Sequence, residues 1–320
     1  MKTPMDRRQF FRCAGTAAAA VSVARTLTLA PKAYAEGPTP KPESPLFRIS
    51  LAEWSLHKAL FAQEMDHLDF PRVAKLDYGI QGIELVNQFF KDKPKDRKYL
   101  SAFKQRALDL NVRCLLIMID DEGALGDPDA GKRKKAVENH YPWVEAAKFL
   151  GCHSIRVNAE THGVGTFHEQ QSRAAEGLQA LSTFAKNHGL GVIVENHGHL
   201  SSNGAWLAGV MQQVGMANCG TLPDFGNFNI SPTEVYDRYR GVQEMMPYAK
   251  AVSAKSNDFD AIGNESHTDF RRMMRIVLDS GYRGWVGIEY EGSELSESEG
   301  ILHTKRLLEQ IQTEFASQYS

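Results

Sequence analysis

Short apolar segments alternate with longer amphipathic segments along the chain from residue 46 onward. Each apolar run has the pattern of a strand buried on both faces, and parallel strands of this kind require helical connections. The predicted strands cover residues 46–54, 80–86, 112–119, 152–157, 190–195, 219–224, 248–255 and 284–289. These eight strand–helix units favour a single closed (β/α)8 barrel of the α/β class over a doubly wound open sheet.

The segments between these strands carry helix start and stop signals. Gly79 and Gly151 are placed to end two helices, because glycine adopts the left-handed conformation of a C-cap without strain. Ser231-Pro232 is predicted to cap and begin a helix that ends near Met246. The other predicted helices cover residues 96–110, 131–150, 169–188, 203–214, 267–280 and 297–315.

The N-terminus has the three parts of a signal peptide. The pair Arg7-Arg8 precedes an apolar segment over residues 13–30, and a small-residue cleavage site ends at Ala35. The paired arginines before two aromatic residues resemble a twin-arginine signal, although Asp6 stands where Ser or Thr is more usual. We expect a periplasmic or otherwise exported protein, cleaved near Ala35; the alternative is a basic, Ala-rich start without this role.

These patterns divide the chain into a signal peptide (1–35), a linker stiffened by four prolines (36–45) and one barrel domain (46–320). The net charge is −2 and the pI about 6.6, with no block of Lys or Arg in the mature part, so nucleic acid is not an expected partner. After the signal, no apolar run has the roughly 20 residues that span a bilayer, so no membrane association is expected. Whether the protein forms a homo-oligomer is left open by the sequence.

Three predicted strands each deliver a carboxylate at the C-terminal end: Glu195, Asp224 and Glu289. A charge at the end of a buried strand is costly unless it is used, and in a barrel these strand ends meet at one mouth. A divalent cation would relieve the repulsion between like charges there. Oxygen ligands suit Mn²⁺, Mg²⁺ or Co²⁺, with Zn²⁺ a further option.

Polar and aromatic residues follow other strands as well. Glu53 ends the first strand, and Asp120-Asp121-Glu122 after the third is interpreted as a solvated acidic loop. The residues predicted to bind substrate are Trp54, His57, Glu84, Arg156, His197, Asn227 and Lys255.

Several of these residues keep a second interpretation. Glu84 and Arg156 are more often ion partners in a barrel interior than catalytic groups. His197 fits a loop residue as well as a ligand. Trp54 and Phe225 are expected as pocket walls.

The strand ends Val194-Glu195-Asn196-His197, Leu222-Pro223-Asp224-Phe225-Gly226-Asn227 and Gly287-Ile288-Glu289-Tyr290-Glu291, in this order, resemble the sugar phosphate isomerase/epimerase group of xylose-isomerase-like TIM barrels. The resemblance implies a metal held by Glu195, Asp224 and Glu289. It also implies a His or similar ligand on the seventh strand, where this chain has Ser253. The fourth ligand is therefore left open between Ser253, His197, water and substrate. Lys255 could supply an ammonium to an oxyanion instead.

The resemblance further implies that Glu195 and Glu289 exchange the proton of a sugar or keto-sugar through an ene-diolate, with a small carbohydrate as the substrate. Two other functions stay open. One is a lyase or hydratase acting on a keto-glycoside with the same carbanion chemistry. The other is a non-catalytic carbohydrate-binding barrel.

Overall fold

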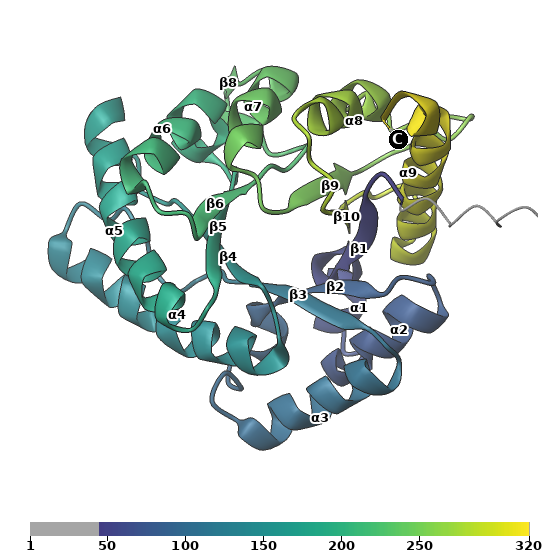
Figure 1. The fold of residues 1–320 in the computed structure, drawn as a ribbon, viewed down its shortest axis with the longest axis horizontal. Coiled ribbons are helices and arrows are strands. Elements are labelled where there is room, and N and C mark those ends of the chain that lie inside the picture. Colours follow the sequence, from purple (N-terminus) through teal and green to yellow (C-terminus); the bar gives the residue numbers. More distant parts are fainter. Residues whose placement is uncertain (1–44, 320) are drawn as a thin grey trace, which may run out of the picture. The chain divides into compact units, whose positions relative to one another are not determined.

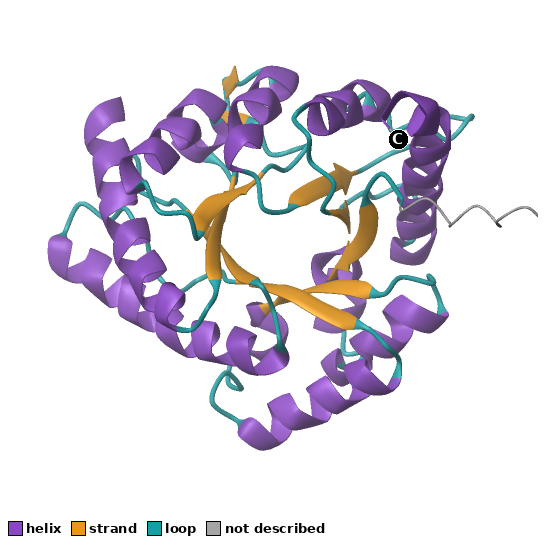
Figure 2. Ribbon diagram, viewed as in Figure 1, coloured by secondary structure: helices purple, strands orange, loops and turns teal. Residues whose placement is uncertain are grey.

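The computed structural model describes residues 45–319, so the signal peptide predicted at 1–35 and most of the predicted linker lie outside the described residues. Eight parallel strands enclose a nearly closed barrel, and helices surround it (Figures 1 and 2). The sheet order is β6-β5-β4-β3-β2-β1-β10-β9, which is sequential around the barrel. The predicted single (β/α)8 TIM barrel is confirmed.

The barrel strands occur at the predicted places along the chain. They are β1 (Arg48–Ala52), β2 (Gly82–Val86), β3 (Arg113–Met118), β4 (Ser154–Asn158), β5 (Gly191–Glu195), β6 (Cys219–Leu222), β9 (Val252–Ser256) and β10 (Trp285–Tyr290). A separate hairpin consists of β7 (Asn229–Ser231) and β8 (Glu234–Val235). The seventh and eighth barrel strands are therefore β9 and β10.

Each barrel strand is followed by helical segments. The α-helices are α1 (His57–Phe61), α2 (Phe70–Leu76), α3 (Arg97–Asp109), α4 (Ala130–Leu150), α5 (Phe167–Asn187), α6 (Gly204–Val214), α7 (Arg238–Met245), α8 (Phe270–Asp279) and α9 (Glu297–Tyr319). The short 3₁₀ segments are η1 (Glu53–Leu56), η2 (His67–Asp69), η3 (Asn87–Phe90), η4 (His199–Ser202) and η5 (Met246–Tyr248). Among residues 45–319, no helix is both long enough and apolar enough to cross a membrane.

The helix predicted to begin at Ser231-Pro232 is wrong at its start. Ser231 pairs with Glu234 across the β7–β8 hairpin. The helix α7 begins only after Asp237, whose carboxylate accepts a hydrogen bond from the Arg240 N–H at 2.8 Å. An N-cap residue satisfies the free N–H groups of the first helical turn, and Asp237 does this where Ser231 does not.

The barrel closes between β6 and β9 through isolated bridges rather than a continuous ladder. These bridges join Thr221 to Ala249 and Asp224 to Ser253. Pro223 has no N–H to donate, so β6 ends before it, but its carbonyl accepts from the Ser253 N–H at 2.9 Å. The seam therefore places Asp224 and Ser253 side by side at the C-terminal mouth.

Apolar side chains form two clusters. The larger one lies between the strands and the surrounding helices. The smaller one comes from strands and their ends alone, which places it inside the barrel: Ala52, Val86, Leu116, Met118, Ile193, Leu222 and Ala251. Because side chains alternate along a strand, polar residues two positions further toward the C-terminal ends, such as Glu195 after Ile193, also face inward.

Candidate functional site

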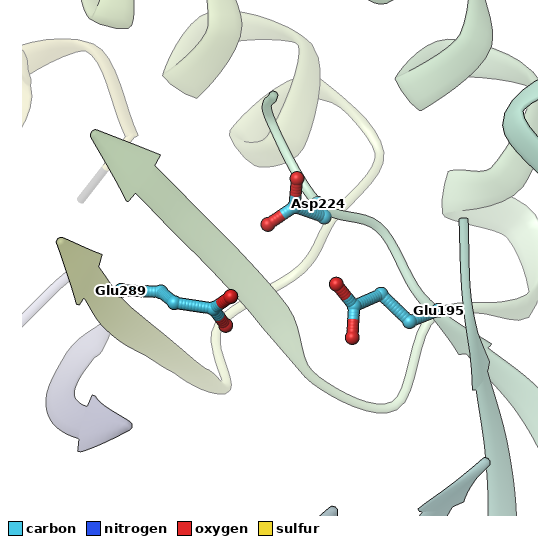
Figure 3. Close-up of side chains that lie close together, drawn as sticks. All are labelled: Glu195, Asp224 and Glu289. Carbon is cyan, nitrogen blue, oxygen red and sulfur yellow. The ribbon is translucent and has the colours of Figure 1, made fainter. Parts of the chain in front are cut away.

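Three carboxylates point toward one another at the C-terminal mouth of the barrel (Figure 3). Glu195 ends β5, Asp224 follows β6, and Glu289 lies near the end of β10. Each contributes a carboxylate oxygen, these oxygens lie within 4.8 Å of one another, and all three side chains are buried. The barrel thus assembles, from three separate strands, the acidic group that the sequence suggested.

A tight turn after β6 fixes Asp224. Its Oδ1 accepts hydrogen bonds from the N–H groups of Gly226 and Asn227, both at 2.8 Å. The side chain of Asn196 bridges the same turn from β5: its nitrogen donates to the carbonyl oxygens of Asp224 and Asn227, and its oxygen accepts from the Asp224 N–H at 2.7 Å. The second carboxylate oxygen of Asp224, Oδ2, therefore faces the centre.

Two buried cations neutralise part of this acidic group. The Nε of Arg156, on β4, lies 2.6 Å from Glu195 Oε2. The Nζ of Lys255, on β9, lies 3.0 Å from Glu289 Oε1 and 3.3 Å from Glu291 Oε2. Because both cations are almost fully buried, these ion pairs are little screened by solvent.

The three carboxylates differ in their affinity for protons. Burial raises the pKa of Glu195 to about 7, although Arg156 opposes the shift. Burial likewise raises the pKa of Asp224 to about 7 against the charge of Lys255. Burial alone would also raise the pKa of Glu289, but Lys255 and then Arg156 outweigh it and hold this pKa below its usual value. The centre thus pairs a carboxylate that stays ionised with two that accept protons near neutral pH.

Ser253 occupies the position on the seventh barrel strand where the resemblance implied an imidazole or similar ligand. Its Oγ donates to Asp224 Oδ2 at 2.7 Å and lies 3.3 Å from Glu289 Oε2. A neutral hydroxyl is a weaker ligand than an imidazole, but it bridges two of the carboxylates and holds them in place.

The donor set fits a divalent cation. Ligand oxygens about 2.1 Å from a metal lie up to about 4.2 Å apart, so the observed spread of 4.8 Å needs only a small inward movement. Three hard carboxylate oxygens suit such an ion, and its charge would offset the acids that Arg156 and Lys255 leave uncompensated. The buried acidic triad could therefore hold a metal.

A cavity of about 250 Å³ opens beside the triad. Glu289 forms part of its wall, whereas Glu195 and Asp224 lie behind the lining. The residues that line it are Trp54, Val86, Gln88, Met118, Asp120, Asp121, Arg156, Asn158, His197, Glu289 and Glu291. It therefore has one apolar side and one side rich in charged and amide groups.

The predicted substrate-binding residues divide into two sets. Trp54, Arg156 and His197 line the cavity. The second set lies outside the lining and consists of His57, Glu84, Asn227 and Lys255. His57 stacks on Trp54, with ring centroids 4.9 Å apart.

Of this second set, Asn227 donates to Glu195 Oε1 at 2.8 Å and accepts from Lys255 Nζ at 3.2 Å. Glu84 accepts from Ser50 Oγ at 2.6 Å and lies in the barrel interior, outside the cavity lining. A Cβ added at Gly287 would lie 2.6 Å from the Glu84 carboxylate, so a larger residue there would displace that carboxylate. Burial raises the pKa of Glu84 to about 7.

Two sequence interpretations are wrong. Asp120 is not part of a solvated loop: its Oδ1 accepts from Arg156 Nη1 at 2.7 Å and from Asn158 Nδ2 at 2.8 Å, and it lines the cavity. Phe225 is not a pocket wall, because it is fully buried and packs edge-on against Phe270 at 5.5 Å. In both cases a distant segment decides the environment of the side chain.

Sequence reasoning assigned no role to Asn196 or Glu291. Asn196 carries no signal beyond its position after Glu195, since its contacts are to a turn 28 or more residues away. Glu291 lies two residues after Glu289 and joins Lys255 to the Trp54 Nε1–H, which donates to it at 2.5 Å. Because side chains two residues apart on a strand share a face, the second Glu at this spacing is a sequence signal that could have placed Glu291 in the site.

Comparison with known proteins gives matches of three kinds. One curated relative, the C-glycoside deglycosidase alpha subunit of Arthrobacter globiformis, is 39% identical over 61 residues. This match covers 18% of the chain and spans 17% of the relative's length.

Solved structures match over most of the chain. The structure of D-psicose 3-epimerase with D-tagatose from Clostridium cellulolyticum H10 has a TM-score of 0.63 at 14% identity, covering 85% of this chain and 99% of that one. The IOLI protein with a bound zinc atom has a TM-score of 0.67 at 15% identity, covering 84% of this chain and 99% of that one. At these identities the likeness is one of fold.

A family model covers the barrel itself. The model described as xylose isomerase-like TIM barrel matches residues 72–311, which include the strands β2 to β10 and all three carboxylates of the triad. The chain therefore belongs to the xylose isomerase-like TIM barrel family.

Proposed function

We propose that this protein is a metal-dependent isomerase or epimerase that acts on a sugar or keto-sugar through an ene-diolate. The observation that carries the proposal is the convergence of Glu195, Asp224 and Glu289 beside a cavity of about 250 Å³. The fold likeness to D-psicose 3-epimerase, whose structure contains D-tagatose, supports the reaction class.

Glu195, Asp224 and Glu289 would hold the metal, with Ser253 or His197 available to complete the shell. When bound, Mn²⁺, Mg²⁺, Co²⁺ or Zn²⁺ would act as a Lewis acid that stabilises negative charge developing on substrate oxygen. The zinc atom in the IOLI protein supports a metal in a barrel of this kind.

Glu195 and Glu289 would exchange the substrate proton. One carboxylate removes the proton from the carbon next to the carbonyl group; the electrons of that C–H bond form the C=C bond of the ene-diolate, and the π electrons of the carbonyl move to its oxygen. The other carboxylate returns a proton from its own side. Delivery to the same carbon inverts that centre, whereas delivery to the former carbonyl carbon, with transfer of a hydroxyl proton between the two oxygens, moves the carbonyl group.

The polar side of the cavity would bind the sugar hydroxyls. Arg156 and Asp120 form an ion pair at 2.7 Å that lines the cavity, and Asn158 donates to the same Asp120 oxygen. This arrangement offers fixed donors and acceptors without a cost of ordering them on binding. Lys255, held between Glu289 and Glu291, keeps the Glu289 carboxylate in place.

Proton exchange in heavy water tests the proposal. We expect deuterium at the carbon next to the carbonyl of a ketohexose, loss of exchange with EDTA, and recovery with Mn²⁺. A protein that binds the sugar with no exchange under any metal would be a binding barrel, and the proposal would be wrong.

A keto-glycoside lyase or hydratase is the second candidate, favoured by the short match to the C-glycoside deglycosidase alpha subunit. It would use the same proton abstraction, but the resulting C=C bond would form with loss of the aglycone from the neighbouring carbon, which leaves through oxygen in an O-glycoside and through carbon in a C-glycoside. Chromatography of the products separates the two, because the lyase alone releases an aglycone.

We also propose that the chain is exported through its twin-arginine-type N-terminus. Replacing Arg7 and Arg8 by Lys should retain the protein in the cytoplasm, as measured by cell fractionation. Export unchanged in this variant would contradict the proposed route.

A further inference from the structure

Three aromatic rings from the segments after β1 and β2 lie against one another, and one of them, Trp54, lines the cavity. We call Trp54, Phe61 and Phe89 the aromatic wall. The ring centroids are 6.0 Å apart for Trp54 and Phe61, 6.1 Å for Trp54 and Phe89, and 5.2 Å for Phe61 and Phe89. The wall therefore runs from a residue that lines the cavity, Trp54, to rings outside the lining.

The polar contacts of the wall all point inward. The Trp54 Nε1–H donates to Glu291 at 2.5 Å, on the charged side of the cavity. The two phenyl rings have no polar atoms at all. His57 stacks on Trp54 at 4.9 Å and holds the indole in place. The outer end of the wall thus offers only apolar ring surface to a ligand.

Phe61 leaves this surface open, because it is 56% exposed. It ends the five-residue helix α1, in which Leu60 is the buried residue. Burial of the full area of a phenylalanine side chain, about 150–250 Å², gives the largest hydrophobic free-energy gain. An exposed phenyl ring next to a binding cavity is therefore available to contact a ligand. The packing of α1 does not use this surface.

A free sugar would leave the outer wall uncovered. The polar groups Arg156, Asp120 and Asn158 lie within the cavity and match hydroxyl groups. The outer rings match a flat apolar group attached to the sugar and projecting from the cavity.

We propose that the ligand is a glycoside of a keto-sugar whose non-sugar part is an aromatic ring, with the sugar in the cavity and the ring against Phe61 of the aromatic wall. This inference rests on the proposed function in taking the cavity as the sugar site. It adds the chemical class of the group attached to the sugar.

The test is binding of a matched series of probes to the full chain: glucose, methyl β-D-glucoside, phenyl β-D-glucoside and octyl β-D-glucoside, measured by calorimetry. We expect the phenyl glucoside to bind at least about tenfold more tightly than the methyl glucoside. Equal binding of these two probes would overturn the inference. A gain for octyl as large as that for phenyl would also overturn it, because the wall would then select any apolar group.

Phe61→Ala locates the contact. This exposed residue lies outside the proposed proton-transfer and metal groups, and we expect the variant to lose most of the phenyl preference while binding the methyl glucoside unchanged. The matched control is Phe167→Ala, since Phe167 is also exposed, at 39%, and follows β4 on the same face. A phenyl preference that survives Phe61→Ala, or falls equally in both variants, would contradict the assignment.

Failure of the proposed function gives a different result. If none of the four probes nor any ketohexose binds, the cavity is not a sugar site and both proposals fail. If the methyl and phenyl glucosides bind equally, only the aromatic inference fails.

Discussion

Two groups of buried acidic side chains in this barrel avoid uncompensated charge in different ways: one by pairing with cations, the other by burial in its neutral form. The first is the triad with its cations Arg156 and Lys255. The second, which we call the Glu53 cluster, consists of Glu53, His67 and Tyr99. Glu53 Oε2 accepts from the Val86 N–H at 2.9 Å, and Oε1 lies 3.5 Å from His67 Nε2, whose Nδ1 lies 2.8 Å from the Tyr99 hydroxyl.

Burial favours the neutral forms in the Glu53 cluster, whereas the triad keeps part of its charge. Burial raises the pKa of Glu53 well above its usual value and lowers that of His67 to about 3. Phe90 and Phe103 stack on His67 at 4.4 and 4.7 Å, and no Lys or Arg among the described residues pairs with Glu53. At the triad, Lys255 keeps Glu289 ionised.

This difference shows that a carboxylate at the end of a strand does not by itself indicate a functional site. Glu53 and Glu195 look alike in sequence, since each ends a buried strand. What separates them is the surroundings: an enclosed aromatic pocket for one, and cations beside a cavity for the other.

The largest expected effect is on proton transfer. Glu195→Gln keeps the shape of the side chain but removes the base, so exchange of the substrate proton should fall about 10²- to 10⁴-fold. Deuterium incorporation followed by NMR measures it. Glu53→Gln is the matched control and should leave exchange unchanged. An equal loss of proton exchange in both variants would mean that the two regions do not differ in function.

Lys255→Met should cost about 3–5 kcal/mol of unfolding free energy at pH 8, because it leaves Glu289 buried without its cation. Urea unfolding in EDTA measures this loss. Added Mn²⁺ should recover part of it, since an ion that binds the folded state alone stabilises it. A loss of the same size with and without Mn²⁺ would argue against a metal at the triad.

Glu84→Gln should change how stability depends on pH. The folded-state pKa of Glu84, about 7, lies above its value near 4.5 in the unfolded chain, so the folded state binds the extra proton and loses stability as pH rises from 4.5 through 7. The loss is on the order of 3 kcal/mol. The variant should therefore be more stable than the parent at pH 8, with the difference vanishing below about pH 4.5. Urea unfolding at several pH values measures this difference in unfolding free energy. A difference between parent and variant that stays the same across this pH range would contradict the raised pKa of Glu84.

The smallest effect should come from the Glu53 cluster. Because burial favours the protonated, neutral form of Glu53, Glu53→Gln should change the unfolding free energy by no more than about 1 kcal/mol. Chemical denaturation at pH 7 gives the value. A loss of several kcal/mol would mean that Glu53 is ionised and paired with a protonated His67.

Much of the fold and part of the site were predictable from local patterns. Alternating strands and helices predicted the barrel. The period of two along a strand puts Ser253 and Lys255 on the same inner face, where both lie beside Glu289. The hairpin at residues 229–235 was missed, because Ser231-Pro232 fits both a helix start and a turn, and only the capping contact of Asp237 decides between them.

The sequence by itself determined the order of the strands and the side chains delivered at their C-terminal ends, because periodicity and helix caps are local. Only the tertiary structure decided which of those side chains work together. Asp120 joins Arg156 across 36 residues, and Glu195 meets Glu289 across half the barrel. Charge in a buried site depends on such distant partners, because desolvation and ion pairing act through space rather than along the chain.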